Sequence, residues 1–145
     1  MAFRFSLQKV VDLKSNQKSQ AEWMLAKALA RQQEEEQMLA RLEQERRNLR
    51  ERLDNSAQTP IPARELAELG RYIDHLDGVI NRKRADVYRA RKAVDDSRQH
   101  LLDRSIDEKV WLRAREKAFE RHRAFVLKKE QHDIDEMASM RAESN

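Results

Sequence analysis

Apolar residues recur at alternating intervals of three and four between residues 66 and 101 of the chain. Nine of the eleven positions in this stripe are apolar, and only Lys83 and Ser97 interrupt it. The stripe consists of Leu66, Leu69, Ile73, Leu76, Ile80, Lys83, Val87, Ala90, Val94, Ser97 and Leu101. Because steps of three and four repeat every seven residues, the pattern predicts a long helix that packs through one narrow face, as in a coiled coil.

The first half of the chain carries the same alternation, with nine apolar residues among fourteen positions. These positions are Leu7, Val11, Lys14, Lys18, Ala21, Leu25, Ala28, Gln32, Glu35, Leu39, Leu42, Arg46, Leu49 and Leu53. The polar segment RQQEEEQ, at residues 31–37, interrupts this stripe. A polar interruption can fix the register of a coiled coil, or it can leave the two helices loosely paired at that point. We favour the locally loose pairing.

The two prolines of the chain, Pro60 and Pro62, both lie between the stripes. Each proline keeps the residue before it out of helical geometry, and Pro62 also suits the first turn of a new helix. Asn55, Ser56 and Thr59 are residue types that favour turns and helix caps. A connection of about eight residues favours antiparallel neighbours. The sequence therefore predicts an all-α fold, a long two-helix antiparallel coiled-coil hairpin that forms a single domain over residues 1–145.

The two arms of the predicted hairpin are unequal. We expect the first helix over about residues 6–56, the turn over residues 57–62 and the second helix over about residues 63–140. If the two helices meet directly at the turn, Leu7 faces about Leu112. The second helix therefore extends past the start of the first helix from about Arg113 onward.

The composition agrees with thin paired helices and not with a thick core. Charged residues make up 39% of the chain and the mean hydropathy is −0.97, which leaves too few apolar side chains to fill a globular interior. The chain has no cysteine, which argues against a disulfide framework or a thiolate metal site. No segment approaches the ~20 apolar residues of a membrane span, and the first residues do not resemble a secretory signal. We expect a soluble, cytoplasmic protein.

The part of the second helix that lacks a partner carries an apolar stripe with aromatic residues, Trp111, Phe119 and Phe125. An exposed stripe of this kind is typical of a contact surface. Basic residues surround it: Arg113, Arg115, Lys117, Arg121, Arg123, Lys128 and Lys129. They would steer the stripe toward an acidic surface of a larger partner. Alternatively, this helix folds back, or the N-terminal residues Phe3 and Phe5 cover it.

The remaining residue patterns give little support to catalysis, metal binding or nucleic-acid binding. The four histidines, at positions 75, 100, 122 and 132, form no metal-binding motif, and no glycine-rich phosphate loop occurs. A two-helix fold offers no enclosed pocket for a reaction, so we expect no enzyme activity and no cofactor. The net charge of +4 is interspersed along the chain, and the basic run RKRADVYRARK, at residues 82–92, spreads its bases around the helix. We therefore expect no nucleic-acid partner.

Three stretches of the chain resemble one known family. These are FRFSLQKVVDLK at residues 3–14, ELGRYIDHLDGVI at residues 68–80 and EKVWLRAREKAFERHRAFVLKKEQHDIDEMASMR at residues 108–141. In order and in spacing they resemble the opening, middle and closing motifs of the flagellar export protein FliJ family. The resemblance implies a two-helix coiled coil similar to the central stalk of rotary ATPases, cytoplasmic and peripherally associated with the inner-membrane type III export apparatus.

The resemblance also implies partners and contact residues. The family inserts into the hexameric ring of the export ATPase FliI, promotes ring formation and links the ring to the export gate protein FlhA, and it has a chaperone-escort role. By analogy with rotary stalks, the ATPase contact is expected at Phe3, Phe5, Leu7, Val11, Trp111, Arg115, Phe119 and Phe125. The gate contact is expected at Leu42, Tyr72, Leu76, Val79 and Lys83, although Leu76 also occupies a stripe position and can have a packing role instead.

Two alternatives to the flagellar stalk remain open. One is a self-contained coiled-coil scaffold or chaperone for export substrates, and the other is the equivalent stalk of a virulence type III secretion system. A self-contained coiled coil has no use for Trp111, Phe119 and Phe125 on one exposed side, so the unpartnered end of the second helix discriminates against the first alternative.

Overall fold

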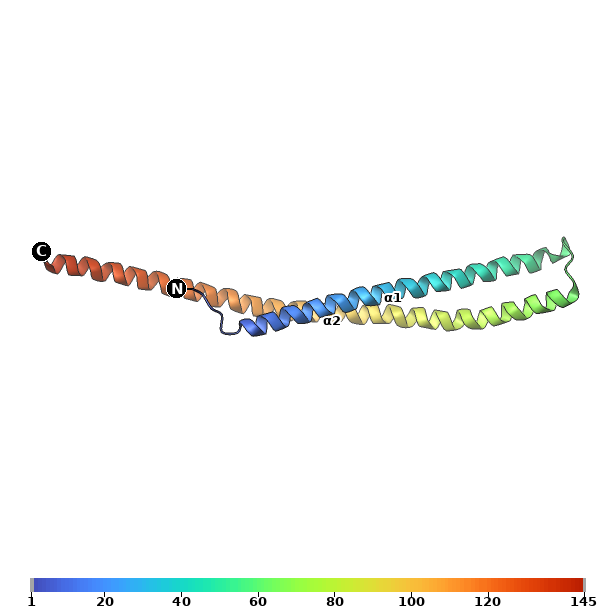
Figure 1. Cartoon of the computed structure of the whole chain (residues 1–145), viewed down its shortest axis with the longest axis horizontal. Coiled ribbons are helices and arrows are strands. Elements are labelled where there is room, and N and C mark those ends of the chain that lie inside the picture. Colours follow the sequence, from blue (N-terminus) through green and yellow to red (C-terminus); the bar gives the residue numbers. More distant parts are fainter. Residues whose placement is uncertain (1, 145) are drawn as a thin grey trace. The chain divides into compact units, whose positions relative to one another are not determined.

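The computed structural model describes residues 2–144, which form two long α-helices joined by a short turn (Figure 1). Helix α1 spans Gln8–Asp54, a single 3-10 turn η1 spans Asn55–Ala57, and helix α2 spans Ala63–Ser144. The predicted all-α helical hairpin is confirmed. Helix α1 begins at Gln8 and not near residue 6, because residues 6 and 7 form a turn in which the Gln8 N–H donates to the Phe5 carbonyl oxygen at 3.0 Å.

The segment between the helices is ordered by backbone hydrogen bonds. The N–H groups of Gln58 and Thr59 both donate to the carbonyl oxygen of Asn55, at 3.0 and 3.1 Å. Pro62 lies one residue before α2, and its carbonyl oxygen accepts the N–H of Leu66 at 3.1 Å. Pro62 therefore supplies the first acceptor of the new helix without needing an N–H of its own.

The chain, which we expected to form a single domain, divides into two compact units. The hairpin unit is Glu22–His100 and contains the turn. The terminal unit combines Met1–Ala21 with Leu101–Asn145. None of the helices among the described residues has an apolar stretch sufficient to cross a bilayer.

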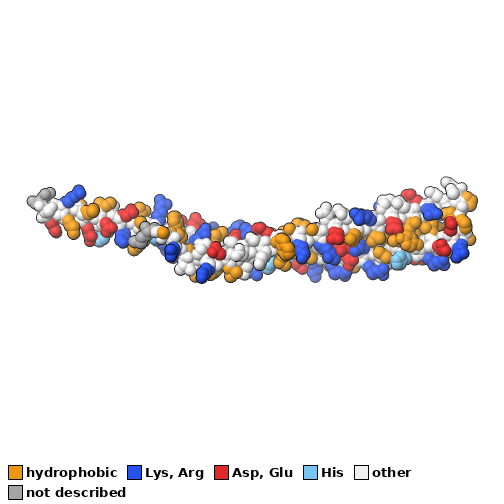
Figure 2. Space-filling view, viewed as in Figure 1, with side chains coloured by type: hydrophobic (Ala, Val, Ile, Leu, Met, Phe, Trp, Pro, Cys, Tyr) orange, Lys and Arg blue, Asp and Glu red, His pale blue; other side chains and the backbone are white. Residues whose placement is uncertain are grey.

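In the hairpin unit, α1 and α2 meet along one seam formed by the two predicted stripes. The buried side chains of α2 are Ile73, Leu76, Ile80, Val87, Ala90 and Val94, and each of them is a stripe position. The two polar stripe residues of α2, Lys83 and Ser97, are half-buried. Ion pairs flank the seam and step in opposite directions along the two helices, with Arg46 paired to Asp77 and Glu36 to Arg91, as antiparallel pairing requires. Outside the seam, side chains of both charges are interspersed (Figure 2).

A buried ion pair crosses the seam where the sequence is most polar. Glu35 is only 5% exposed, and its Oε2 atom accepts a hydrogen bond from Nζ of Lys83 at 2.9 Å. Its Oε1 atom accepts a second bond from Nε of Arg31 at 3.0 Å. The locally loose pairing expected at residues 31–37 is therefore wrong, because the interruption of one stripe is matched by the interruption of the other. A carboxylate taken out of water needs such a partner.

The terminal unit pairs the start of α1 with the middle of α2. Val11 and Ala21 are buried, and Lys14 forms an ion pair with Asp107 at 2.8 Å. Figure 1 shows the red end of α2 continuing past the start of α1. From residue 123 to residue 144 every described side chain is exposed except Val126, which is half-buried. This part of α2 has no helix beside it among the described residues.

Replacing Ile80 with alanine should lower the free energy of unfolding by about 2–5 kcal/mol, because it removes a buried side chain and leaves a cavity in the seam. Urea unfolding followed by far-UV circular dichroism measures the change. The matched control is Tyr88→Ala on the same helix, which removes an exposed side chain and should change stability by about 0.5 kcal/mol or less. Equal losses in the two variants would contradict the seam as the main source of stability.

Candidate functional site

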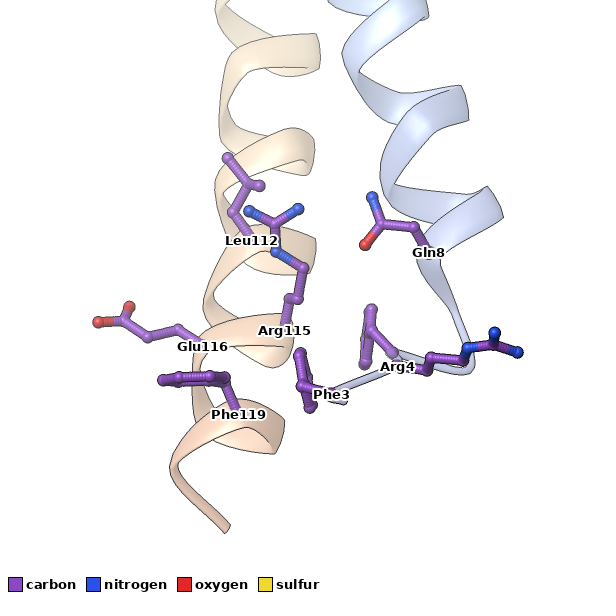
Figure 3. Close-up of a pocket in the computed structure, with 8 residues that line it drawn as sticks. Phe3, Arg4, Gln8, Leu112, Arg115, Glu116 and Phe119 are labelled. Atoms are coloured by element: carbon purple, nitrogen blue, oxygen red, sulfur yellow. The ribbon is translucent and has the colours of Figure 1, made fainter. Parts of the chain in front are cut away.

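The terminal unit contains an aromatic cluster between the N-terminal segment and α2 (Figure 3). The ring of Phe3 meets the ring of Phe119 edge to face, with the ring centroids 5.2 Å apart and the planes at 81°. The Phe3 ring also lies 5.5 Å from the ring of His122. A groove beside this cluster is lined by Phe3, Arg4, Phe5, Gln8, Leu112, Arg115, Glu116 and Phe119.

The cluster is only partly covered. Phe119 is 47% exposed although Phe3 packs against it, and Phe125, farther along α2, is 58% exposed. The N-terminus therefore covers one edge of Phe119 and reaches His122, as one of the alternatives from the sequence anticipates. The apolar stripe beyond His122 stays open to solvent.

The residues expected to contact an ATPase do not all lie on one surface. Phe3, Phe5, Arg115 and Phe119 are brought together around the groove. Val11 instead is buried, so its role is packing within the seam. Leu7 is exposed and Trp111 half-buried, and neither lines the groove, while Phe125 lies farther along α2. We use the name terminal surface for the exposed and half-buried members of this set on α2: Trp111, Arg115, Phe119 and Phe125.

Three groove residues were missed from the sequence: Arg4, Gln8 and Glu116. Leu112 was expected only as the residue that faces Leu7, and it also lines the groove. Glu116 could have been found, since it stands three and four residues from Phe119 and Leu112 on the same helix face. Arg4 gave no signal, because it lies outside any periodic segment.

The bases around the terminal surface differ from those of the hairpin unit in their lack of ion pairs. Among the described residues, none of the seven lysines and arginines between positions 113 and 129 forms an ion pair. The basic run at residues 82–92 differs, because Lys83, Arg84, Arg89 and Arg91 all pair with carboxylates. The terminal surface therefore presents basic side chains without ion pairs beside exposed aromatic rings.

The residues expected to contact an export gate have different surroundings. Tyr72 is 43% exposed, and its hydroxyl donates to Oε1 of Glu45 at 2.8 Å. That hydrogen bond raises the pKa of Tyr72. Leu42 and Val79 are half-buried. Leu76 is only 3% exposed and packs in the seam, which favours the packing role that we left open for it.

Lys83, also expected at the gate contact, is engaged inside the hairpin unit. Its ammonium bonds Glu35 at 2.9 Å and lies 3.4 Å from Oδ2 of Asp86. The hydrogen bond to Glu35 raises the pKa of Lys83, and the same bond lowers the pKa of Glu35. Lys83 therefore stabilises the pairing of α1 and α2 within the chain itself.

The histidine and carboxylate side chains of the described residues are not arranged to bind a metal ion. Among the described residues, no cluster of three or more histidine, aspartate or glutamate side chains is placed to hold a metal ion. His122 lies against Phe3, and Nε2 of His132 lies 3.2 Å from Glu136 in the next turn of the same helix.

The seam defines the chain as an antiparallel coiled-coil hairpin protein, and its terminal surface carries exposed aromatic side chains with basic residues around them. The sequence model of the family described as Flagellar FliJ protein matches residues 3–145. The chain therefore belongs to the FliJ family, a non-enzymatic component of the flagellar export apparatus. No curated relative and no solved structure matches the chain significantly.

Replacing Glu35 with glutamine should lower the thermal midpoint of unfolding and reduce its dependence on pH in acid. Lys83 holds the pKa of Glu35 below its ordinary value of 4.5, so the charged pair stabilises the fold fully above pH 4.5. That contribution is lost as the pH falls from 4.5 through the lowered pKa. In alkali the raised pKa of Lys83 keeps the contribution intact up to 10.5, and it is lost as the pH rises further through the raised pKa.

Thermal unfolding followed by circular dichroism between about pH 2 and pH 7 measures this effect. Glu34→Gln is the matched control, since Glu34 is the exposed neighbour of Glu35. Superimposable curves for the wild type and the Glu35→Gln variant would show that the pair contributes nothing to stability, and parallel curves would contradict the predicted pH dependence.

Proposed function

We propose that this protein is the stalk of the flagellar export ATPase. Its terminal unit inserts into the hexameric ring of FliI and promotes assembly of the ring, and its hairpin unit couples the ring to the export gate protein FlhA. Membership of the FliJ family supports an export role. The observation that carries the finer proposal is the exposure of Phe119 and Phe125, at 47% and 58%, on a part of α2 that no other helix covers.

The aromatic residues of the terminal surface supply the contact area. Phe119 and Phe125 are large and rigid, and such side chains carry much of the binding energy in protein interfaces. Leaving both in water costs free energy in the isolated chain. A ring of subunits that surrounds this part of α2 can bury both side chains at once.

The unpaired bases supply the attraction. Arg115 belongs to the groove itself, and Arg121 and Arg123 flank Phe119 and Phe125 along α2. Because these side chains form no ion pair with a carboxylate among the described residues, they favour an acidic lining in the partner. We therefore expect association with the ATPase to slow as the ionic strength rises.

In this proposal, only three of the five residues expected at the gate contact can touch the gate protein directly. Tyr72 is exposed, with Leu42 and Val79 half-buried, so these three residues can meet a partner directly. Leu76 and Lys83 support the contact from within the seam.

An escort role for export chaperones is a second candidate. It is favoured by an exposed apolar surface on α1 that the stalk function does not use. Trp23 and Met24 are 65% and 50% exposed there, and Nζ of Lys27 lies 5.2 Å from the centroid of the Trp23 ring.

Replacing both Phe119 and Phe125 with serine should abolish stimulation of FliI ATP hydrolysis and weaken binding by about 30-fold or more, as for the loss of an interface hot spot worth about 2 kcal/mol. Helicity should be unchanged, because both side chains are exposed. The measurement is the ATPase rate and ring formation of FliI with increasing amounts of each variant. Tyr88→Ser, which removes an exposed ring from the hairpin unit, is the control and should stimulate normally. Full stimulation of ATP hydrolysis by the double variant, or no stimulation by the wild type, would contradict the proposal.

A further inference from the structure

Residues 2–7, which we call the N-terminal strap, lie against α2 without being part of either helix (Figure 3). The backbone hydrogen bonds of the strap stay within its own end of the chain. The Phe5 carbonyl oxygen accepts from Gln8, and the Leu7 carbonyl oxygen accepts from Val10 and Val11. Among the described residues, no hydrogen bond or ion pair joins the strap to α2. Side-chain packing alone holds it there.

The packing contact of the strap is concentrated in one side chain. Phe3 touches the rings of Phe119 and His122, with centroid distances of 5.2 and 5.5 Å. Phe5 is half-buried beside the same groove. A segment held by the packing of Phe3 and Phe5, with no polar anchor to α2 among the described residues, can leave its site without breaking a hydrogen bond.

The strap occupies the same side of α2 as the terminal surface. Phe119 is still 47% exposed with Phe3 upon it, so departure of Phe3 would open more of this ring to a partner. A protein that buries the whole Phe119 side chain needs the edge that Phe3 now covers. The strap and such a protein therefore exclude each other at Phe119 and His122.

We propose that the N-terminal strap is a displaceable cover that competes with the export ATPase for the Phe119 face of α2. The inference rests on the proposed function, since it takes FliI as the competitor. Six residues span at most about 20 Å when extended, so a displaced strap stays close to its site at high effective concentration. It returns when the partner leaves, and Phe3 thereby regulates contact at the terminal surface.

Replacing Phe3 with alanine should tighten binding to purified FliI by about two- to tenfold, the range expected when an edge-to-face aromatic pair no longer competes. The affinity is measured with the full-length chain, for example by titration of labelled protein with FliI. Leu13→Ala is the control, because it removes another exposed apolar side chain of the terminal unit and should leave the affinity unchanged.

A strap that is covalently joined to α2 provides a second test, in which binding to FliI should become weaker. The chain has no cysteine, so Phe3→Cys with His122→Cys introduces a single pair that a short bismaleimide can join. The joined protein should bind FliI at least about tenfold more weakly than the same double variant before joining, since the strap can no longer leave. The unjoined double variant is the matched reference for both substitutions.

The outcomes separate the cover from the stalk function itself. If the wild type binds FliI but Phe3→Ala binds equally or more weakly, the cover is overturned and the proposed function stands. The same conclusion follows if the joined protein binds as well as the unjoined one. If neither the wild type nor any variant binds FliI, the proposed function fails, and the competition fails with it.

Discussion

The two helices of this protein are held together by one apolar stripe on each, and that stripe can be buried against only one neighbour. In the hairpin unit, residues such as Ile73, Ile80 and Val94 bury the stripe of α2, and the rest of the helix surface is mostly charged or polar. On this part of α2 a third helix therefore finds no second continuous apolar stripe to pack against. Where α2 has no helix beside it among the described residues, as over residues 123–144, all its side chains but the half-buried Val126 are exposed to water. An exposed end is thus a direct consequence of a fold built on one seam.

The same constraint explains why the polar layer at Glu35 matters. A seam of similar apolar residues could slip by seven positions and still bury the same kind of surface. Such a slip would place Glu35 near Leu76 or Ala90 and leave a carboxylate buried without a partner. Because an unpaired buried charge is costly, the bond from Lys83 to Glu35 favours one register. The register then determines which part of α2 lies beyond α1.

The stripes and the turn could be predicted from the sequence, because helical periodicity and proline geometry are local properties of the chain. The pairing of Glu35 with Lys83 could not, since it depends on a match between the two stripes that neither stripe shows alone. The contact of Phe3 with Phe119 involves a segment without periodicity, so no pattern indicated where it lies. A family motif also cannot separate packing from partner contact, and for this reason Val11, which is buried, was included among the contact residues.

The central claim is that the seam leaves part of α2 free to be enclosed by the export ATPase. Hydrogen–deuterium exchange of the full chain, with and without assembled FliI, tests it most directly, because an unpacked helix exchanges its amide protons faster than a packed one. The account predicts that FliI slows exchange across residues 111–137 and leaves residues 73–94 unchanged. Protection confined to the hairpin unit, or no protection at residues 111–137 in a saturated complex, would contradict it.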